Sequence, residues 1–143
     1  MKSIPDIQDE ITEEFEAYDN WMDKYNCLIE LSRELPAIDP RMKVNENLIN
    51  GCQSKVWLNA EYRDGHIYFT ADSDAIITKG IVALLIRVLS GRTPVEIMNA
   101  DLYFIDRIGL RQNLSPTRSN GLLSMIRQMK LYALAYDAKF SNK

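Results

Sequence analysis

Apolar residues recur at helical spacing through the first quarter of the chain, with acidic residues between them. The apolar face of the first predicted helix consists of Ile7, Ile11, Phe15 and Tyr18. Pro5 is expected to open this helix, at a position where the missing N–H of proline costs little. The same spacing predicts a second helix over about residues 20–35, and Pro36 ends it. An irregular, proline-containing loop is expected over residues 36–51.

The pattern then changes to alternation of apolar and polar residues, which is typical of strands. It covers residues 56–61 and residues 66–71. Asp64 and Gly65 lie between the two segments and favour a turn with positive φ, so the segments are predicted to form a β-hairpin. His66, the single histidine, lies beside this turn. We interpret it as a solvated strand residue rather than a general base.

Residues 75–90 are apolar around nearly the whole helical circumference, which is typical of a buried central helix. Ser73 or Asp74 is the expected N-cap of this helix. Gly80 lies inside it, where glycine costs about 1 kcal/mol relative to alanine, so we expect it to permit close packing against the sheet. Gly91 is expected to end the helix.

Three further helices are predicted in the last third of the chain. Residues 93–96 have the spacing of a capping box with proline at the first helical position, which predicts a short helix ending near Asn99. Another helical turn is expected near residues 103–109. Ser115 is the candidate cap of a last helix that runs from about residue 118 or 119 to residue 137. Its predicted apolar face consists of Leu122, Leu123, Met125, Ile126, Met129, Leu131, Tyr132 and Leu134.

The composition indicates an ordinary globular protein. A chain of 143 residues corresponds to about one domain, and its 46% apolar and 26% charged residues are typical of soluble proteins. We find no N-terminal segment of signal-peptide type and no run of about 18 apolar residues, so neither secretion nor membrane spanning is expected. Cys27 lies in a helix-like context and Cys52 in a loop-like one. We therefore expect two free thiols in a reducing cytoplasm.

The net charge of −3 conceals an asymmetry between the two ends of the chain. Residues 1–35 hold ten acidic and three basic residues, whereas residues 107–143 hold seven basic and one acidic residue. The two ends are expected to attract each other if they pack together, and the basic end is suited to steering an acidic partner. The bases are dispersed and no nucleic-acid-binding motif accompanies them, so nucleic-acid binding is not predicted.

Cys52 is the main candidate for chemistry, because it follows Gly51 at the junction of the predicted loop and strand. The thiolate is the reactive form of cysteine, and nearby cations favour it. Lys55 is close in sequence, and Arg118 is predicted to be close in space. The alternative is a small buried hydrophobic residue, since free cysteine is among the most buried residue types. Cys27 is interpreted in that way, as core or near-core packing.

The rest of the sequence limits the chemistry open to a reactive cysteine. A cysteine hydrolase needs a base and an oxyanion site, and the single histidine is a poor candidate for the base. No Cys-x-x-Cys, no phosphate-binding loop and no cysteine or histidine at metal-ligand spacing is present. Thiol exchange with an activated sulfur, by contrast, needs only one accessible thiolate. Cleavage of a carbon–sulfur bond would then belong to a partner that carries a cofactor.

Several sequence blocks, in their order and spacing, resemble the SufE family of sulfur-acceptor proteins, which includes CsdE. The blocks are Asn20-Trp21, Lys24-Tyr25, Gly51-Cys52-Gln53-Ser54, Val56-Trp57, Asp72-Ser73-Asp74-Ala75, Thr78-Lys79-Gly80, Thr93-Pro94 and Leu114-Ser115-Pro116-Thr117-Arg118-Ser119-Asn120-Gly121-Leu122. The similarity extends over about residues 5–137. Thr117 and Asn120 stand where serine and glutamine are common in the family, and Cys27 is not part of the pattern.

The resemblance implies an α/β (α+β) fold, a small antiparallel sheet packed against helices and related to the IscU scaffold. It also implies a function. Proteins of this family accept a persulfide sulfur from a PLP-dependent cysteine desulfurase of the SufS or CsdA type, stimulate that enzyme, and pass sulfur to an iron–sulfur scaffold complex such as SufBCD. Their accepting cysteine matches Cys52, which is expected at a loop tip beside an apolar cavity. The resemblance implies a partner protein rather than an enzyme, with no cofactor of its own and no membrane partner.

The residues predicted to support the site or contact the partner are Gly51, Gln53, Ser54, Lys55, Asp74 and Arg118. Asp74 has a structural alternative as a helix cap, and Arg118 has one as a cap or ion-pair partner at the start of the last helix. Two other functions stay open. An IscU-like scaffold would need three or four soft ligands, whereas this chain offers only Cys27, Cys52 and His66. A purely allosteric activator would stimulate a desulfurase without carrying sulfur.

Overall fold

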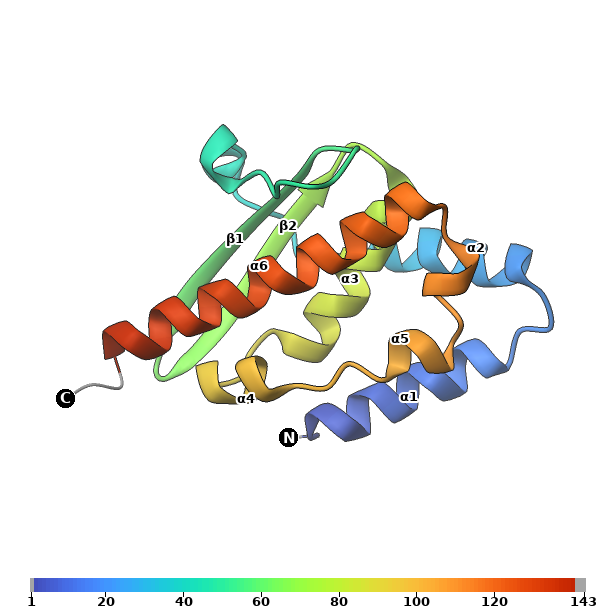
Figure 1. Cartoon of the computed structure of the whole chain (residues 1–143), viewed down its shortest axis with the longest axis horizontal. Coiled ribbons are helices and arrows are strands. Elements are labelled where there is room, and N and C mark those ends of the chain that lie inside the picture. The colour runs from blue at the N-terminus through green and yellow to red at the C-terminus, as the bar shows by residue number, and fades with distance from the viewer. Residues whose placement is uncertain (1, 141–143) are drawn as a thin grey trace.

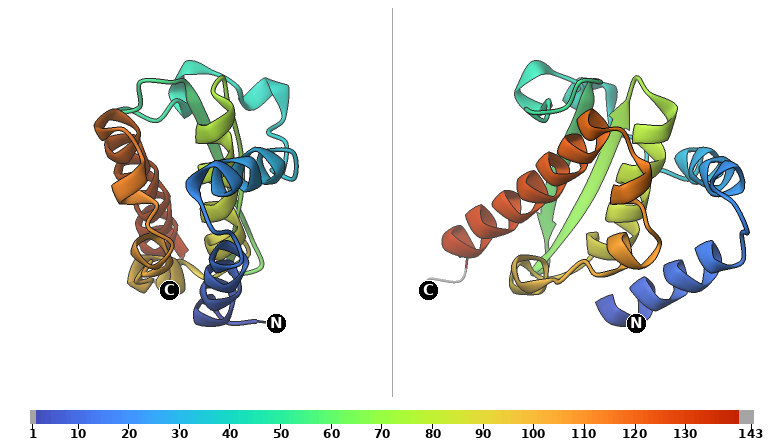
Figure 2. Two further views of the ribbon diagram at one scale, coloured as in Figure 1. Left: turned by 90° about the vertical axis from the view of Figure 1, so that its right-hand side faces the viewer. Right: turned by 45° about the vertical axis from the view of Figure 1, so that its right-hand side comes forward.

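A computed structural model describes residues 2–140 as a two-stranded antiparallel sheet packed against helices, the α+β arrangement expected (Figure 1). The elements in chain order are α1 (Ile4–Glu16), α2 (Trp21–Ser32), η1 (Pro40–Met42), η2 (Asn45–Asn47), β1 (Val56–Arg63), β2 (His66–Ser73), α3 (Ile76–Leu89), α4 (Pro94–Asn99), α5 (Phe104–Arg107), η3 (Arg111–Asn113) and α6 (Pro116–Phe140). The helices α4, α5 and α6 form a layer along one side of α3 and the hairpin (Figure 2). None of the helices in the described part is long and apolar enough to cross a membrane.

The β-hairpin confirms the alternating pattern and its turn. β1 and β2 pair from Val56 opposite Ser73 to Arg63 opposite His66. Asp64 has φ 51 and the following glycine φ 80, the left-handed conformation that an Asp-Gly turn accommodates. The inward-facing side chains of both strands are buried, so one face of the hairpin closes the core.

The central helix α3 is buried as predicted, but two details of the prediction were wrong. Its N-cap is Ala75, without a side-chain capping bond, because the Asp74 carboxylate accepts the backbone N–H of Lys55 instead. Gly80 does permit close packing, but against α2 rather than the sheet. A Cβ at this position would collide with the backbone carbonyl of Leu28 in α2.

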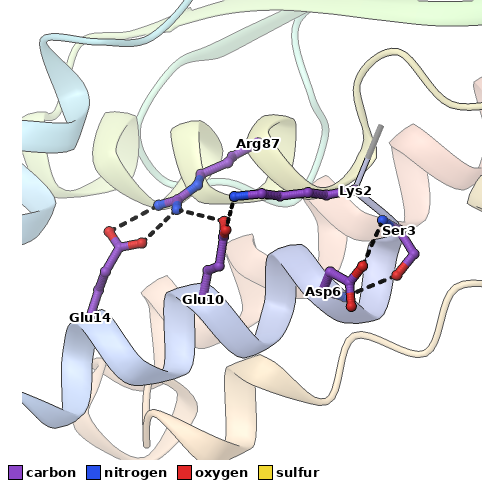
Figure 3. A network of polar contacts seen from close by, with 6 residues as sticks. All are labelled: Lys2, Ser3, Asp6, Glu10, Glu14 and Arg87. Carbon is purple, nitrogen blue, oxygen red and sulfur yellow. Dashed lines mark hydrogen bonds and ion pairs between the residues drawn. The ribbon is translucent and has the colours of Figure 1, made fainter.

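Helix α1 begins one residue before Pro5, after a capping box between Ser3 and Asp6. It is attached to α3 by ion pairs that Figure 3 shows: the Arg87 guanidinium lies 2.5 Å from the Glu14 carboxylate and 3.6 Å from that of Glu10. The acidic end of the chain therefore pairs with the middle of the sequence.

The predicted attraction between the two ends of the chain is realised at one place. Arg107 of α5 lies 3.4 Å from Asp9 of α1. No ion pair among the described residues joins α1 to α6. Of the bases in α6, Arg127 is exposed, whereas the Lys130 ammonium donates to the backbone carbonyls of Met98 and Ala100.

Helix boundaries in the last third follow the predicted caps. The capping box of Thr93 and Glu96 is present. Ser115 accepts the Arg118 N–H at 3.2 Å as a cap, but the last helix starts earlier than predicted, at Pro116, and continues to Phe140. The predicted apolar face of this helix is buried only in part, because Leu123, Leu131 and Leu134 lie exposed.

The segment between α2 and β1 is more ordered than the irregular loop predicted for it. Helix α2 ends at Ser32, and two short 3₁₀ helices, η1 and η2, follow. Ile49 is buried, and Leu48 forms a β-bridge with Trp57. This segment is therefore held against the hairpin just before Cys52.

Candidate functional site

Cys52 lies in the short connection between η2 and β1, where the chain meets the N-terminal part of α6. The preceding residue, Gly51, has φ 92, and a Cβ there would collide with the Ser124 side chain of α6. The Cys52 thiol donates a hydrogen bond to the backbone carbonyl of Gly121, with 3.6 Å between sulfur and oxygen. A Cβ at residue 121 would lie 3.5 Å from the same sulfur. Small residues on both sides thus let the loop sit directly on the helix.

The thiol borders a cavity of about 300 Å³ between the loop, α3 and α6. The cavity is lined by Cys52, Gln53, Ser54, Thr78, Ile81, Ser115, Thr117, Arg118, Gly121 and Met125. The fold therefore brings Gln53, Ser54 and Arg118 together with Cys52, as the sequence predicted. The predicted residues Gly51, Lys55 and Asp74 do not line this cavity.

Lys55 and Asp74 fix the end of the Cys52 loop through backbone groups. The Lys55 N–H donates to the Asp74 carboxylate at 3.0 Å, and the Lys55 carbonyl accepts from the Ser73 hydroxyl at 2.8 Å. The Asp74 N–H also donates to that carbonyl, at 3.2 Å. Asp74 thus lies near the loop as proposed, but it anchors the loop instead of capping α3.

The segment before Cys52 has a second anchor in a charged cluster. The Asp72 carboxylate lies 2.9 Å from the Lys43 ammonium and 3.2 Å from the Lys79 ammonium. The Lys43 ammonium also lies over the Trp57 ring, 4.4 Å from its centre. Residues 72–74 at the end of β2 therefore fasten the chain both before and after Cys52.

Burial raises the pKa of the Cys52 thiol above its ordinary value, and no neighbouring charge offsets the effect. The hydrogen bond to the Gly121 carbonyl also favours a raised pKa, because only the protonated sulfur can donate it. Lys55 and Arg118 were expected to favour the thiolate. In this structure neither lowers the pKa of Cys52, so the site holds a protonated, half-buried thiol.

The other candidate residues lie away from this cavity. His66 pairs with Arg63 at the far end of the hairpin, seven residues along β2 from Ser73. That separation corresponds to roughly 23 Å of strand, and a hydrogen-bonding contact of 2.8 Å joins the His66 ring to the Asp64 carbonyl. Histidine is therefore not the base of a Cys52 reaction, as predicted.

Cys27 occupies a separate surface depression lined partly by acidic residues of α2. It is half-buried, and it packs against the edge of the core as predicted. Over residues 2–140, no group of three or more His, Cys, Asp or Glu side chains could hold a metal ion.

The sequence did not single out the helix face on which the loop rests. Gly121 and Ser124 present this face on α6, and Thr78 and Ile81 of α3 line the cavity beside it. A helical glycine costs about 1 kcal/mol relative to alanine, so Gly121 within the last helix was the available signal for a close contact.

Comparison with known proteins agrees with this architecture. A family profile described as "SufE: Fe-S metabolism associated domain" matches residues 9–133. The chain is 36% identical over 140 residues to SufE-like protein 1, chloroplastic/mitochondrial, from Arabidopsis thaliana. That match covers 97% of this chain but 38% of the plant protein, so the chain spans little more than a third of that relative's length.

A solved structure supports the same fold. The solution structure of a hypothetical protein from Thermus thermophilus superimposes with a TM-score of 0.74 at 19% identity, over 90% of this chain and 94% of the other. The fold and the site define a small α+β domain with a half-buried cysteine on a short loop beside a cavity. The chain belongs to the SufE family.

Proposed function

We propose that this protein accepts a persulfide sulfur on Cys52 from a PLP-dependent cysteine desulfurase, stimulates that enzyme, and passes the sulfur to an iron–sulfur scaffold. Membership of a family associated with Fe–S metabolism supports the pathway. The assignment of sulfur acceptance to Cys52 is supported by its position, because it is a single thiol on a short loop that borders a cavity. The protein acts as a sulfur-transfer partner with no cofactor of its own, in a reducing compartment such as the cytoplasm.

The proposed transfer is a thiol exchange. The Cys52 thiolate attacks the outer sulfur of the persulfide on the donor enzyme, a new S–S bond forms, and the donor S–S bond breaks. The donor cysteine leaves as a thiolate and takes up the proton that Cys52 has lost, so the exchange needs no oxidant or reductant. Cys52 then carries the persulfide for a second exchange with the acceptor.

In this proposal, docking of the desulfurase activates the thiol. Burial raises the pKa of Cys52, and its proton is held by the Gly121 carbonyl. Docking that lifts the loop from α6 would remove both effects together. The thiolate would then form beside Arg118, whose side chain lines the same cavity and favours a neighbouring anion.

The test is to incubate the protein with a cysteine desulfurase and cysteine, and then to measure its intact mass. The expected adduct adds about 32 Da, one sulfur atom, and alkylation of the thiol prevents it. Cys52→Ser should abolish the adduct, and the matched variant Cys27→Ser should retain it. Absence of the adduct on the wild-type protein would refute sulfur acceptance, and an adduct on Cys27 would refute the assignment to Cys52.

Two further measurements separate the alternatives. If the protein is a purely allosteric activator, the Cys52→Ser variant should stimulate the desulfurase as well as the wild type does. An IscU-like scaffold would retain stoichiometric iron or zinc after anaerobic purification, which elemental analysis detects. We expect Cys52→Ser to stimulate less than the wild type does. We also expect no bound metal, because no group of three or more His, Cys, Asp or Glu among the described residues could hold one.

A further inference from the structure

The outer face of α6 carries a row of exposed leucines. Leu123, Leu131 and Leu134 are 42%, 48% and 54% exposed, and their spacing along the helix places them on one side of it. Arg127 lies between them on the same face and is also exposed. Helix α6 crosses the outside of the molecule in Figure 1. Clustered exposed apolar side chains on a small protein mark an interaction surface.

A groove runs beside this row. It has a volume of about 590 Å³ and lies between Leu123, Ile126 and Lys130 of α6 and the segment 100–107, with Arg111 at its edge. Its lining is mixed, with apolar side chains from both walls and charged groups around them. The leucine row and the groove together form a continuous surface, which we call the α6 surface.

The charge of the α6 surface is opposite to that of the whole protein. Bases around it are Arg107, Arg111, Arg127 and Lys130, whereas Asp101 and Asp106 are the acids in the groove. Asp106 lies 3.8 Å from Arg111, and Arg107 lies 3.4 Å from Asp9 of α1, so the charges of these two pairs compensate each other and the excess positive charge comes from Arg127 and Lys130. Arg127 forms no ion pair within residues 2–140. The net charge of the chain is nevertheless −3, so this positive region is local.

We propose that the α6 surface docks a short amphipathic helix of another protein, with leucine-like residues on one face and acidic residues flanking them. From residue 123 to residue 134 the row extends for 11 residues, about 16 Å or three helical turns. A helix of about 12 residues matches this length, and an apolar face set into a groove is a recurrent mode of peptide recognition. The flanking carboxylates would meet Arg127, the base of this surface that forms no ion pair within residues 2–140.

A second copy of this chain is a poorer occupant of the surface. A two-fold axis through the middle of the leucine row would place Arg127 of one copy opposite Lys130 of the other, and like charges in contact disfavour the pair. The acidic helix α1 is attached to α3 and α5 by Arg87 and Arg107. The charge therefore selects an acidic partner of different sequence.

The docking is independent of sulfur transfer. Cys52 contacts α6 at Gly121, on its inward side, whereas the leucine row lies on the outward side of the same helix. Cys52→Ser should accordingly bind the partner helix as the wild type does. This variant makes failure of the docking proposal distinguishable from failure of the proposed function.

The experiment titrates the ¹⁵N-labelled full chain with a synthetic helical peptide of about 12 residues, carrying leucines on one face and flanking glutamates. A matched peptide has lysine at every glutamate. We expect the acidic peptide to change the amide chemical shifts of residues 123–134 and 100–111 only. The lysine peptide should cause no such changes. Arg127→Glu and Leu131→Ser should each weaken binding by about tenfold, and Arg127→Glu should favour the lysine peptide.

Exposed residues elsewhere supply the matched controls. Met22→Ser removes an exposed apolar side chain from α2, and Arg41→Glu reverses an exposed charge in η1; neither should alter binding. Equal binding of both peptides, shifts located elsewhere, or no saturable binding would overturn the proposal. So would a concentration-dependent dimer that Leu131→Ser abolishes, because the surface would then serve self-association.

Discussion

The two cysteines of this protein have similar burial but different surroundings. Both are free and half-buried, and burial raises the pKa of each. At Cys52 no neighbouring charge adds to the effect of burial or opposes it. At Cys27 the carboxylates of Glu14 and Glu30 raise the pKa further, while a hydrogen bond with Tyr18 and the charge of Arg87 lower it.

Exposure alone therefore does not identify a reactive thiol. Cys27 lies within α2, and Asp23 and Glu30 of the same helix line its surface depression, so these acidic neighbours stay with it when a partner approaches. Cys52 lies on a loop, so a movement of that loop away from α6 would remove both its burial and its hydrogen bond to the Gly121 carbonyl. A cation, Arg118, then borders the site. Reactivity at Cys52 is therefore conditional, whereas at Cys27 the acidic surroundings are fixed.

The largest effect is expected from forcing the loop off α6. In Gly51→Val the new side chain would collide with Ser124 and would also be strained at φ 92. The Cys52 thiol should then react with iodoacetamide about tenfold faster, equivalent to one pKa unit, while the Cys27 rate stays constant. Peptide mapping by mass spectrometry measures both rates in one sample.

A matched control for this variant is Gly65→Val. Its backbone is similarly strained, at φ 80, but nothing lies near the added Cβ. It should leave the Cys52 rate unchanged. A parallel increase at both cysteines in Gly51→Val would mean general loosening of the fold, which contradicts a local loop release.

The pH dependence separates the two thiols next. In the wild type, the alkylation midpoints of Cys27 and Cys52 should both lie above the ordinary value of 9.0. In Gly51→Val the midpoint of Cys52 should fall toward 9.0, and that of Cys27 should not move. If both midpoints stay in place, burial against α6 is not the cause of the raised Cys52 pKa.

The raised pKa values of Cys27 and Cys52 also determine how the stability of the protein changes with pH. Each folded-state pKa is raised, so the folded protein holds the proton more tightly than the unfolded chain does. The stabilisation is fully present well below pH 9.0 and does not change there. The free energy of unfolding should decrease as the pH rises from 9.0 through the folded-state pKa values. The variant with both cysteines changed to serine should show a flatter alkaline profile in urea unfolding.

Cutting the loop anchor should have a moderate effect. Asp74→Ala removes the acceptor of the Lys55 N–H, at a cost of about 1 kcal/mol in the free energy of unfolding. Alkylation of Cys52 should rise severalfold, because the loop is held less firmly, and alkylation of Cys27 should not change. Urea unfolding measures the first quantity and peptide mapping the second.

Asp19→Ala is the control for the anchor, since Asp19 is an exposed acid between α1 and α2. It should change neither quantity. If Asp74→Ala lowers stability but leaves Cys52 unreactive, the anchor supports the hairpin and not the position of the thiol.

The features that could be predicted from the sequence are those set by short-range chemistry. The Asp64-Gly65 turn, the capping box at Thr93 and the loop position of Cys52 each depend on a few neighbouring residues. The family resemblance supplied the rest of the fold expectation. It also marked Arg118, which the structure places at the Cys52 cavity.

The features that could not be predicted depend on which elements meet in space. Asp74 has the right side chain for an N-cap, but its carboxylate is taken by a competing backbone donor, the N–H of Lys55, in the folded chain. Gly80 packs against α2 because α2 crosses α3 at that point. Helical periodicity places apolar residues on faces, but it does not say that one face of α6, including Leu131, stays uncovered.

A smaller effect is expected at Cys27. Tyr18→Phe removes the hydrogen bond that lowers the pKa of Cys27, so this thiol should react a fewfold more slowly at constant pH. The alkylation rate of Cys52 should not change, because Tyr18 lines the depression at Cys27 and not the cavity at Cys52. A faster reaction of Cys27 in Tyr18→Phe would show that the tyrosine shields the sulfur more than it stabilises the thiolate.

The smallest effect on the resting protein is expected from Arg118→Ala. No neighbouring charge contributes to the raised pKa of Cys52, so removal of this guanidinium should leave the alkylation rate of the resting thiol unchanged. In the proposed transfer the thiolate forms beside the cavity that Arg118 lines. The time course of the sulfur adduct with a desulfurase should therefore slow severalfold, and Arg118→Lys should restore most of the rate. Slower alkylation of the resting thiol would mean that Arg118 already acts before docking. No change in either measurement would leave Arg118 with only its backbone bond to Ser115 at the start of α6.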